Sequence, residues 1–284
     1  MPRKTSQQSI EIRGLLSRFG LKAKKGLGQH FLIDHTILST IVSAAEITLE
    51  DNILEIGPGL GILTVELARS AACVIAVEID SKLTALLERR LSHLPNLRII
   101  NTDILKVNLS HILQDRVSYK VVANLPYYIT SPILRYFIGA PVKPALMVVM
   151  VQKEVAESIV AKSGKMTAMA VSTQVYANPQ IVTYVPAHSF YPQPKVDSAI
   201  VRIDMLPEPK FKSGNIDDFL DIVRCGFSSP RKQIRNSLAQ GLQMKPAEAS
   251  ILLEKAAINP QHRPENLGID EWERLYRAVI LSRS

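Results

Sequence analysis

Short apolar stretches alternate with helical patterns through the first half of the chain. Five of these stretches have the length of strands and are apolar at almost every position, namely 53–56, 74–79, 97–100, 120–123 and 145–151. Strands of this kind are typical of a parallel sheet that helices cover on both faces. Residues 181–185 and 199–205 form a further apolar pair, which indicates an antiparallel edge. The pattern therefore predicts an α/β fold with a mainly parallel sheet of seven strands.

Helices are expected between these strands. Asp34 is a suitable N-cap for a helix over 35–46. A second helical stretch covers 61–70, and leucines on one helical face follow Ser81, which we expect to cap a third helix. These helices would cover the faces of the sheet.

The composition changes after residue 206. Residues 206–214 have the character of a linker, and helical patterns follow at 216–225, 232–239, 246–256 and 269–281. Asp270 is the expected cap of the last helix. The chain therefore divides into a basic N-terminal arm (1–26), an α/β domain (27–206) and a small helical domain (207–284).

Positive charge is concentrated near the N-terminus. The 284 residues carry a formal net charge of +8, and residues 1–30 hold seven Lys or Arg against one Glu. Lys22, Lys24 and Lys25 are the densest group. Such a segment can contact the phosphates of a nucleic acid, but it can equally be a solvated arm. Charge alone leaves both interpretations open.

Composition excludes several classes of protein. A hydrophobic content of 46% rules out a wholly disordered chain, and no apolar run reaches the roughly 18–20 residues of a membrane span. The N-terminus has no apolar core of a secretory signal. Cys73 and Cys225 stand apart and lack the spacing of metal ligands. We therefore expect a cytoplasmic protein without a metal and without a membrane partner.

A glycine-rich turn follows the first of these strands. Residues 55–61 read Glu-Ile-Gly-Pro-Gly-Leu-Gly and lead from a strand into a helix. Glycines let the backbone approach a ligand closely at the positive end of a helix. Glu78 ends the next strand, where a carboxylate can accept both hydroxyl hydrogens of a ribose. Gly57, Gly59 and Glu78 therefore indicate a nucleotide-like ligand.

The spacing of these glycines is informative about the ligand. It departs from the G-x-G-x-x-G pattern of dinucleotide sites and is similar to the turn of S-adenosylmethionine-dependent methyltransferases. In that class an acidic residue at the position of Asp103 binds the adenine amine, although Asp103 alone could equally be a turn residue. On this turn alone a dehydrogenase stays possible.

A second motif, Asn-Leu-Pro-Tyr-Tyr at 124–128, follows the fourth strand. The Asn124 amide oxygen and the Leu125 carbonyl can accept the two hydrogens of an exocyclic amine, which directs the nitrogen lone pair toward an incoming methyl group. Pro126 fixes a bent backbone, and Tyr127 can stack on a base. An ordinary Asn-Pro turn is the alternative, which the position after the fourth strand disfavours.

Together these motifs resemble those of the ribosomal RNA adenine N6,N6-dimethyltransferases. The similarity is greatest to the bacterial small-subunit branch, whose loss confers kasugamycin resistance. It extends from about residue 24 to the C-terminus. Its further elements are the segments 28–32 (Gly-Gln-His-Phe-Leu), 189–198 (Ser-Phe-Tyr-Pro-Gln-Pro-Lys-Val-Asp-Ser) and 264–267 (Pro-Glu-Asn-Leu).

The resemblance implies a Rossmann-like S-adenosylmethionine methyltransferase domain, without a metal, and a helical domain that contacts RNA. Asn124 and the Leu125 carbonyl would hold the target amine, with Pro126 fixing the backbone, and Tyr127 and Phe190 would sandwich the flipped adenine. The residues implied to bind the cofactor are Gln29, His30, Leu32, Gly57, Gly59, Glu78, Asp103 and Asn124.

The resemblance also implies a substrate and a partner. Two adjacent adenosines in a hairpin near the 3′ end of small-subunit rRNA would each be methylated twice. The rRNA would be part of a precursor ribosomal subunit, and no obligate protein partner is implied.

Two positions depart from the usual pattern of the family. His30 stands where Asn is commonest, so its contact with the cofactor stays open. Pro230 replaces one Arg of a C-terminal segment that contacts RNA. The residues expected to contact phosphates are Lys22, Lys24, Lys25, Arg231 and Lys232.

Three alternatives remain at this point. A relative that methylates one adenosine of large-subunit rRNA shares these motifs, but the extended C-terminal domain and the basic arm argue against it. A DNA adenine methyltransferase usually has a target-recognition insert, and the pattern contains none. An assembly factor without catalysis would not need the intact motifs at 57–61 and 124–127.

Overall fold

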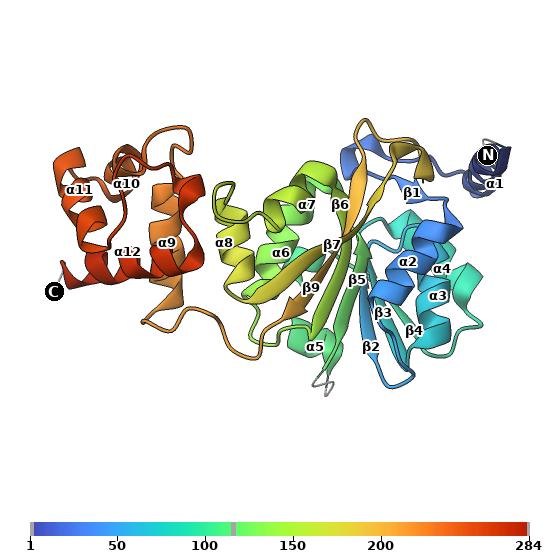
Figure 1. Cartoon of the computed structure of the whole chain (residues 1–284). Coiled ribbons are helices and arrows are strands. Elements are labelled where there is room, and N and C mark those ends of the chain that lie inside the picture. The colour runs from blue at the N-terminus through green and yellow to red at the C-terminus, as the bar shows by residue number, and fades with distance from the viewer. Residues whose placement is uncertain (1–2, 115–117, 283–284) are drawn as a thin grey trace. The chain divides into compact units, whose positions relative to one another are not determined.

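The computed structural model describes residues 3–114 and 118–282, apart from the side chains of residues 3–9, Glu11 and Lys25. Within this part of the chain, a sheet flanked by helices precedes a group of helices along the sequence (Figure 1). None of the described helices is long and apolar enough to cross a membrane.

The chain forms two compact units. The first holds Met1–Ala156 and Pro179–Met205, and the second holds Glu157–Asn178 and Leu206–Ser284. The second unit therefore includes a segment that lies well before the expected boundary at residue 206. Its helix α8 (Ala168–Gln174) packs against helix α9 (Ile216–Gly226), which accounts for the difference.

A seven-strand sheet is the centre of the first unit (Figure 1). Its order is β4-β3-β2-β5-β6-β9-β7, and the first five of these strands run parallel, whereas β9 is antiparallel to β6. This confirms the predicted mainly parallel α/β sheet. The strands are β2 (Asn52–Ile56), β3 (Cys73–Glu78), β4 (Leu97–Asn101), β5 (Lys120–Asn124), β6 (Leu146–Gln152), β7 (Ala177–Val185) and β9 (Ser198–Met205).

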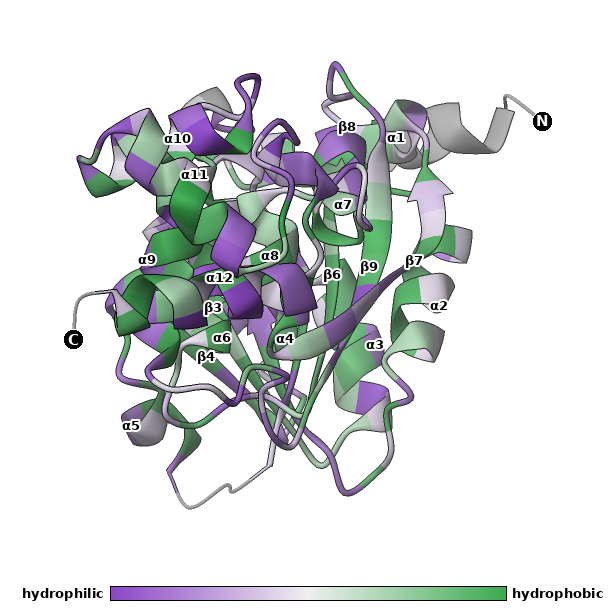
Figure 2. Ribbon diagram, turned by 60° about the vertical axis from the view of Figure 1, so that its left-hand side comes forward, coloured by the Kyte–Doolittle hydropathy of each residue, from purple (hydrophilic) through white to green (hydrophobic). Residues whose placement is uncertain are grey.

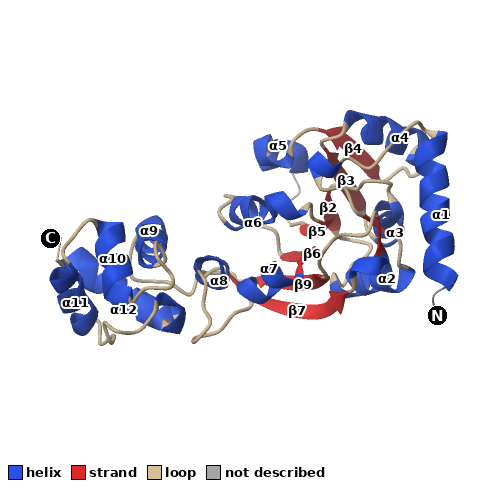
Figure 3. Cartoon of the chain, turned by 90° about the horizontal axis from the view of Figure 1, so that it is seen from above, coloured by secondary structure: helices blue, strands red, loops and turns tan. Residues whose placement is uncertain are grey.

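Helices cover both faces of this sheet. Figure 3 shows α2 and α3 on one side and α5 and α6 on the other. The helices are α1 (Arg3–Arg18), α2 (His35–Ala44), α3 (Ile62–Ser70), α4 (Ser81–Leu91), α5 (Leu109–Leu113), α6 (Thr130–Ile138) and α7 (Lys153–Ile159), the last of which crosses the boundary between the units. The strand order reverses between β2 and β5, because β3 and β4 follow β2 toward one edge of the sheet and β6 follows β5 toward the other. Ligands bind at such switch points in open α/β sheets.

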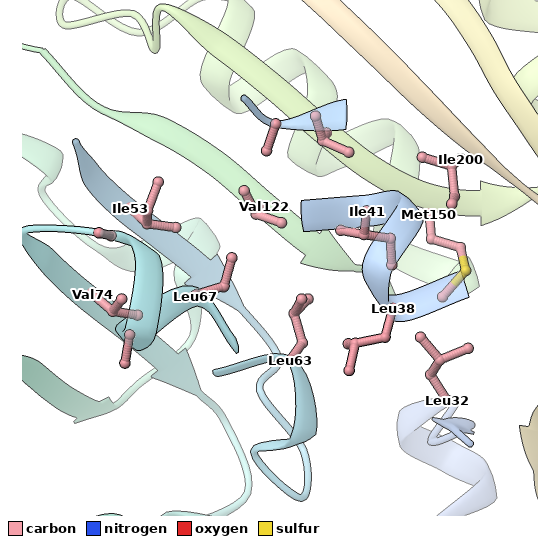
Figure 4. Close-up of a cluster of buried hydrophobic side chains, with 14 of the residues drawn as sticks. Leu32, Leu38, Ile41, Ile53, Leu63, Leu67, Val74, Val122, Met150 and Ile200 are labelled. Carbon is pink, nitrogen blue, oxygen red and sulfur yellow. The ribbon is translucent and has the colours of Figure 1, made fainter. Parts of the chain in front are cut away.

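One hydrophobic core cluster lies between the sheet and helices α2 and α3. Leu38 and Ile41 of α2, with Leu67 of α3, meet buried side chains of the strands such as Val122 and Met150 (Figure 4). The central strands are apolar at most positions because helices bury both of their faces. Figure 2 shows this as green along β6. Edge strand β7 instead alternates between more and less exposed positions.

The N-caps of α2 and α4 test two of the predicted helix boundaries. Asp34 caps α2 as expected, since its side chain accepts a hydrogen bond from the Thr36 amide at 2.9 Å. The prediction for Ser81 was wrong. Asp80 is the N-cap of α4 because its backbone is extended and its carboxylate accepts from the Lys82 amide at 3.1 Å.

The N-terminal arm contains a helix that packs on the first unit. Ile12 and Leu16 of α1 are buried in a cluster with Phe31, Leu60 and Leu83. The interpretation as a solvated arm is therefore wrong for this helix, because one of its faces is apolar and finds a partner.

A small second sheet was not predicted from the pattern. Strand β1 (Phe31–Leu32) pairs antiparallel with β8 (Phe190–Tyr191), and Leu32 is opposite Phe190. Two-residue strands carry too little periodicity to be recognised in a sequence. The pairing places the segment after the arm next to the segment that precedes β9.

The second unit is helical, as the pattern beyond residue 206 predicts. Trp272 is fully buried with Leu275 and Tyr276, which confirms its expected core position. Asp270 was wrong as a cap, because α12 begins after Gly268, whose amide donates to the Glu271 side chain at 2.7 Å. The helices are α8 (Ala168–Gln174), α9 (Ile216–Gly226), α10 (Ile234–Leu242), α11 (Pro246–Lys255) and α12 (Ile269–Leu281).

Candidate functional site

A cavity of about 310 Å³ opens where β2, β3 and β5 end, at the switch point of the sheet. The structure brings the whole set of predicted cofactor residues to this cavity. Its lining includes Gln29, His30, Leu32, Gly57, Gly59, Glu78, Asp103 and Asn124. Leu125, Pro126 and Tyr127 of the second motif also line it. Residues that are almost a hundred positions apart in the sequence therefore meet at one site.

The glycine turn forms one wall of the cavity. Gly57, Gly59 and Gly61 have φ angles of +65°, +58° and +76°, which side chains with a Cβ rarely adopt. A Cβ added to Gly57 would meet no atom within 4 Å, so this position leaves space for a ligand. A Cβ added to Gly61 would lie 2.7 Å from Leu87, so Gly61 serves the packing of α4 instead.

Glu78 is held from two sides by backbone amides. Its Oε2 accepts from the Gly59 amide at 3.2 Å, and its Oε1 accepts from the Asp80 amide at 2.9 Å. Burial raises the pKa of Glu78, while these hydrogen bonds act in the opposite direction. The carboxylate is thus fixed at the end of β3 beside the glycine turn, as the nucleotide interpretation requires.

Glu55 is a cavity residue that sequence reasoning did not single out. Its side chain is almost fully buried, and its Oε2 has no hydrogen-bond partner among the described residues. Burial raises its pKa to about 8, the Thr64 hydroxyl opposes the shift, and the neighbouring Glu78 raises it further. Its place as the first residue of the glycine motif is the signal that could have identified it.

Asp103 caps a turn and also faces the cavity. Its Oδ1 accepts from the Leu105 amide at 3.1 Å and caps the short turn after β4. The residue also lines the cavity. Because one oxygen satisfies the turn, the second is the one that can accept a ligand hydrogen.

The orientation of Asn124 is set by the segment that carries His30. The Asn124 Nδ2 donates to the His30 carbonyl at 3.0 Å. With its nitrogen engaged in this way, the amide oxygen is the atom that can accept a hydrogen from a substrate. Leu125 follows it and donates its amide to the Met150 carbonyl at 3.1 Å, which ties the motif to β6.

Tyr127 is fixed at its hydroxyl and along one face. Its hydroxyl hydrogen-bonds to Ser198 at 2.8 Å, and its ring stacks on His30 at 5.7 Å between centroids and 23° between planes. The His30 Nδ1 is 2.6 Å from the Pro192 carbonyl. His30, the position that departs from the family pattern, is therefore a structural partner of Tyr127.

Phe190 does not reach the cavity in this structure. It is 3% exposed and packs in the core cluster with residues such as Leu38 and Met150. The ring that lies against Tyr127 is that of His30. The sandwich of an adenine between Tyr127 and Phe190 is thus not formed here, and the role of Phe190 stays a prediction.

The predicted phosphate contacts have different surroundings. Lys22 is exposed, and so are Arg231 and Lys232 in the turn before α10. Lys24 instead forms an ion pair with Asp80, with 2.7 Å between Nζ and Oδ2. The side chain of Lys25 lies outside the described residues.

No group of three or more His, Cys, Asp or Glu within the described ranges could hold a metal ion.

A cavity at the switch point of an α/β sheet, with a glycine turn on one wall and an oriented amide on another, is the arrangement of a Rossmann-like methyltransferase. Comparison with known proteins narrows this class. The family model for ribosomal RNA adenine dimethylase matches residues 20–280. The chain therefore belongs to the ribosomal RNA adenine dimethylase family, whose methyl donor is S-adenosylmethionine, and it is a methyltransferase.

Several relatives are similar over nearly their whole length. Ribosomal RNA small subunit methyltransferase A of Dehalococcoides mccartyi is 47% identical over 266 residues, which are 93% of this chain and 91% of the relative. The protein of the same name from Clostridioides difficile is 39% identical over 93% of each chain.

Two solved structures are similar in fold and sequence. The dimethyladenosine transferase from Plasmodium falciparum has a TM-score of 0.72 and 27% identity, over 87% of this chain and 96% of that one. The 23S rRNA methyltransferase ErmE has a TM-score of 0.70 and 29% identity, over 88% and 99%. Together these comparisons identify ribosomal RNA as the substrate class.

Proposed function

We propose that the chain transfers methyl groups to N6 of two adjacent adenosines in a hairpin near the 3′ end of small-subunit rRNA. The observation that carries this proposal is the fixed amide of Asn124, whose Nδ2 is held by the His30 carbonyl beside the cavity. The names of the bacterial relatives, at 39% and 47% identity, favour the small subunit over the large one.

The cavity residues fit S-adenosylmethionine. The space at Gly57 accommodates the methionine part of the cofactor. Glu78 accepts hydrogen bonds from the two ribose hydroxyls, and Asp103 accepts one from the adenine amine. The unpartnered, buried Glu55 Oε2 leaves a polar atom beside the glycine turn that a bound ligand can engage. Gln29, His30 and Leu32 close the cavity from the N-terminal side.

The target amine is positioned by the second motif. The Asn124 Oδ1 and the Leu125 carbonyl each accept a hydrogen bond from N6. These two bonds direct the nitrogen lone pair toward the incoming methyl group. Tyr127 stacks on the flipped adenine, an interaction worth about 1–3 kcal/mol per base. Bound S-adenosylmethionine supplies an electrophilic methyl group on a sulfonium. No strong general base is needed, because N6 loses its proton after it has become cationic.

The remaining parts of the chain contact the rRNA. Lys22 on the first unit and Arg231 and Lys232 on the second are exposed and positively charged, which suits contacts with phosphates. We place the substrate in a precursor small subunit and the reaction in the cytoplasm. These proposed contacts support a division of the chain into an N-terminal arm, a methyltransferase domain and an RNA-contacting domain.

A methylation assay with three substrates tests the proposal. Labelled S-adenosylmethionine is supplied with unmethylated small subunits, large subunits or DNA, and the products are analysed as nucleosides. We expect N6,N6-dimethyladenosine only in the small-subunit RNA. Label in large-subunit RNA or in DNA would contradict the assignment, and binding to small subunits without any label would favour a non-catalytic assembly factor.

A further inference from the structure

We propose that Lys24 is a positioning residue of the cofactor site, which together with Gln29 holds Asp80 and thereby fixes the carboxylate of Glu78. The inference rests on the proposed contact between Glu78 and the ribose of the cofactor. It gives Lys24 a role other than the phosphate contact that its charge alone predicts.

A closed set of polar contacts joins the three residues. The Lys24 Nζ lies 2.7 Å from Asp80 Oδ2, and the Gln29 Nε2 donates to the same oxygen at 3.2 Å. The Lys24 amide donates to Gln29 Oε1 at 2.8 Å. Each residue therefore contacts the other two, and we call Lys24, Gln29 and Asp80 the Lys24 clasp.

Burial distinguishes this ion pair from an ordinary surface pair. The side chain of Asp80 is 4% exposed, whereas that of Lys24 is 48% exposed. Exposed pairs contribute little, but a carboxylate removed from water depends on its partners. Burial acts to raise the pKa of Asp80, and hydrogen bonds from Lys24, Gln29 and the Lys82 amide outweigh it and lower the pKa. The charge of Lys24 is thus engaged within the chain.

Asp80 connects the clasp to the cofactor cavity. Its side chain binds the clasp through Oδ2 and caps α4 through Oδ1, which accepts from the Lys82 amide at 3.1 Å. Both contacts fix the backbone of Asp80, whose own amide donates to Glu78 Oε1 at 2.9 Å. Loss of the clasp would loosen the turn that carries one of the amides holding Glu78.

The clasp also restrains a segment that lines the cavity. Gln29 belongs to the clasp and to the cavity lining, and the next residue, His30, accepts from Asn124 at its carbonyl. Upstream, α1 is anchored by Ile12 and Leu16. Lys24 therefore lies between an anchored helix and the cavity wall, where it can set the affinity of the cofactor without touching it.

The test is calorimetric binding of S-adenosylhomocysteine, the unreactive product, to the full chain. Lys24→Gln should weaken binding roughly tenfold, an ordinary size for coupling between neighbouring sites. Lys24→Arg keeps the charge and should recover most of the affinity. The control is Arg18→Gln, which removes the same charge from an exposed position of the same arm and should bind as the wild type does.

A double-mutant cycle keeps the test independent of general destabilisation. Once Asp80→Asn has removed the carboxylate, Lys24→Gln should cause no further loss of affinity. Equal binding by Lys24→Gln and wild type, or additive losses in the double variant, would overturn the proposal. Failure of the wild type itself to bind S-adenosylhomocysteine would instead count against the proposed function.

Discussion

At the scale of single residues, the site depends on groups whose hydrogen-bonding directions are fixed before any ligand binds. Asn124 is oriented by the His30 carbonyl, and Glu78 by the amides of Gly59 and Asp80. Such preorganisation matters because a misplaced reacting group loses rate even where binding is retained. Substitutions at these positions should therefore separate catalysis from RNA binding.

Asn124→Ala should lower the methyl-transfer rate by roughly 10²-fold or more, because the target amine loses an acceptor that orients it. The affinity for small-subunit RNA should stay close to that of the wild type, since the proposed phosphate contacts lie elsewhere. Single-turnover methylation and filter binding measure the two quantities. A loss of RNA affinity that matches the loss of rate would argue against this role of Asn124.

Glu55 should make stability depend on pH. Burial raises its pKa to about 8 in the folded chain, against an ordinary value of 4.5. The folded state therefore keeps a proton that the unfolded state loses, and the stabilising contribution is full below about pH 4.5 and lost as pH rises to about 8.

Glu55→Gln cannot ionise and serves as the reference for this effect. The free energy of unfolding of the wild type, measured relative to this variant, should fall by a few kcal/mol between pH 5 and 8 and then level off. Glu78 titrates in both proteins, so the difference reports the protonation of Glu55 together with its electrostatic coupling to Glu78. Chemical denaturation at several pH values measures it, and a difference that does not change with pH would show that Glu55 is not protonated in the folded chain.

The sequence allowed most of these residues to be assigned, but not their surroundings. Gly57, Glu78 and Asn124 were recognisable because each lies at or directly after the end of a strand that the hydrophobic pattern marks. The burial of Phe190 and the stacking of His30 on Tyr127 depend on the two-residue pairing of β1 with β8. Contacts set by such short pairing, between residues distant in sequence, leave no local pattern.

At the scale of elements, strands were easier to predict than the helix ends. Strands buried on both faces are apolar at most positions, so β2, β3, β5 and β6 stand out in the sequence. The caps at Ser81 and Asp270 were wrong because a neighbouring residue, Asp80 or Gly268, has the extended backbone of the cap. The closeness of helix packing also cannot be predicted from the sequence, and alanine substitutions at two glycines test it.

Gly241→Ala should destabilise the second unit although it lies within a helix. Alanine ordinarily favours a helix over glycine by about 1 kcal/mol. Here a Cβ would lie 2.5 Å from Cα and Cβ of Cys225 in α9, and overpacking of this kind costs about 1–3 kcal/mol. The single tryptophan, Trp272, is buried in this unit, so its fluorescence during denaturation reports the change.

Gly14→Ala in α1 is the matched control with the opposite sign. A Cβ there meets no atom within 4 Å, so the variant should be more stable by about 0.5–1 kcal/mol. Circular dichroism during denaturation follows this helix. Stabilisation by both substitutions would mean that α9 and α10 are less closely packed than described.

At the scale of the whole molecule, the net positive charge says less about contacts with a polyanion than the surroundings of each lysine do. The net charge of +8 suggests a polyanionic partner, and the sequence places much of it in the arm. The structure divides that charge. Lys24 is engaged by buried Asp80, whereas Lys22 and Lys232 are exposed.

The salt dependence of RNA binding distinguishes these lysines. Lys22→Ala and Lys232→Ala should each reduce the slope of log affinity against log salt concentration by about 1, because each removes one phosphate contact. Lys24→Ala should change the slope less, since its charge is already paired. An equal effect of Lys24→Ala and Lys22→Ala would mean that the ion pair opens when RNA binds.

The central claim is that the Asn124 motif positions N6 of adenosine in small-subunit rRNA to receive the methyl groups of S-adenosylmethionine. The most direct measurement is mass spectrometry of rRNA fragments from unmethylated small subunits incubated with S-adenosylmethionine and either wild type or Asn124→Ala. We predict two neighbouring N6,N6-dimethyladenosines near the 3′ end with the wild type and almost none with the variant. Methylation at another base, or equal methylation by the variant, would contradict the account.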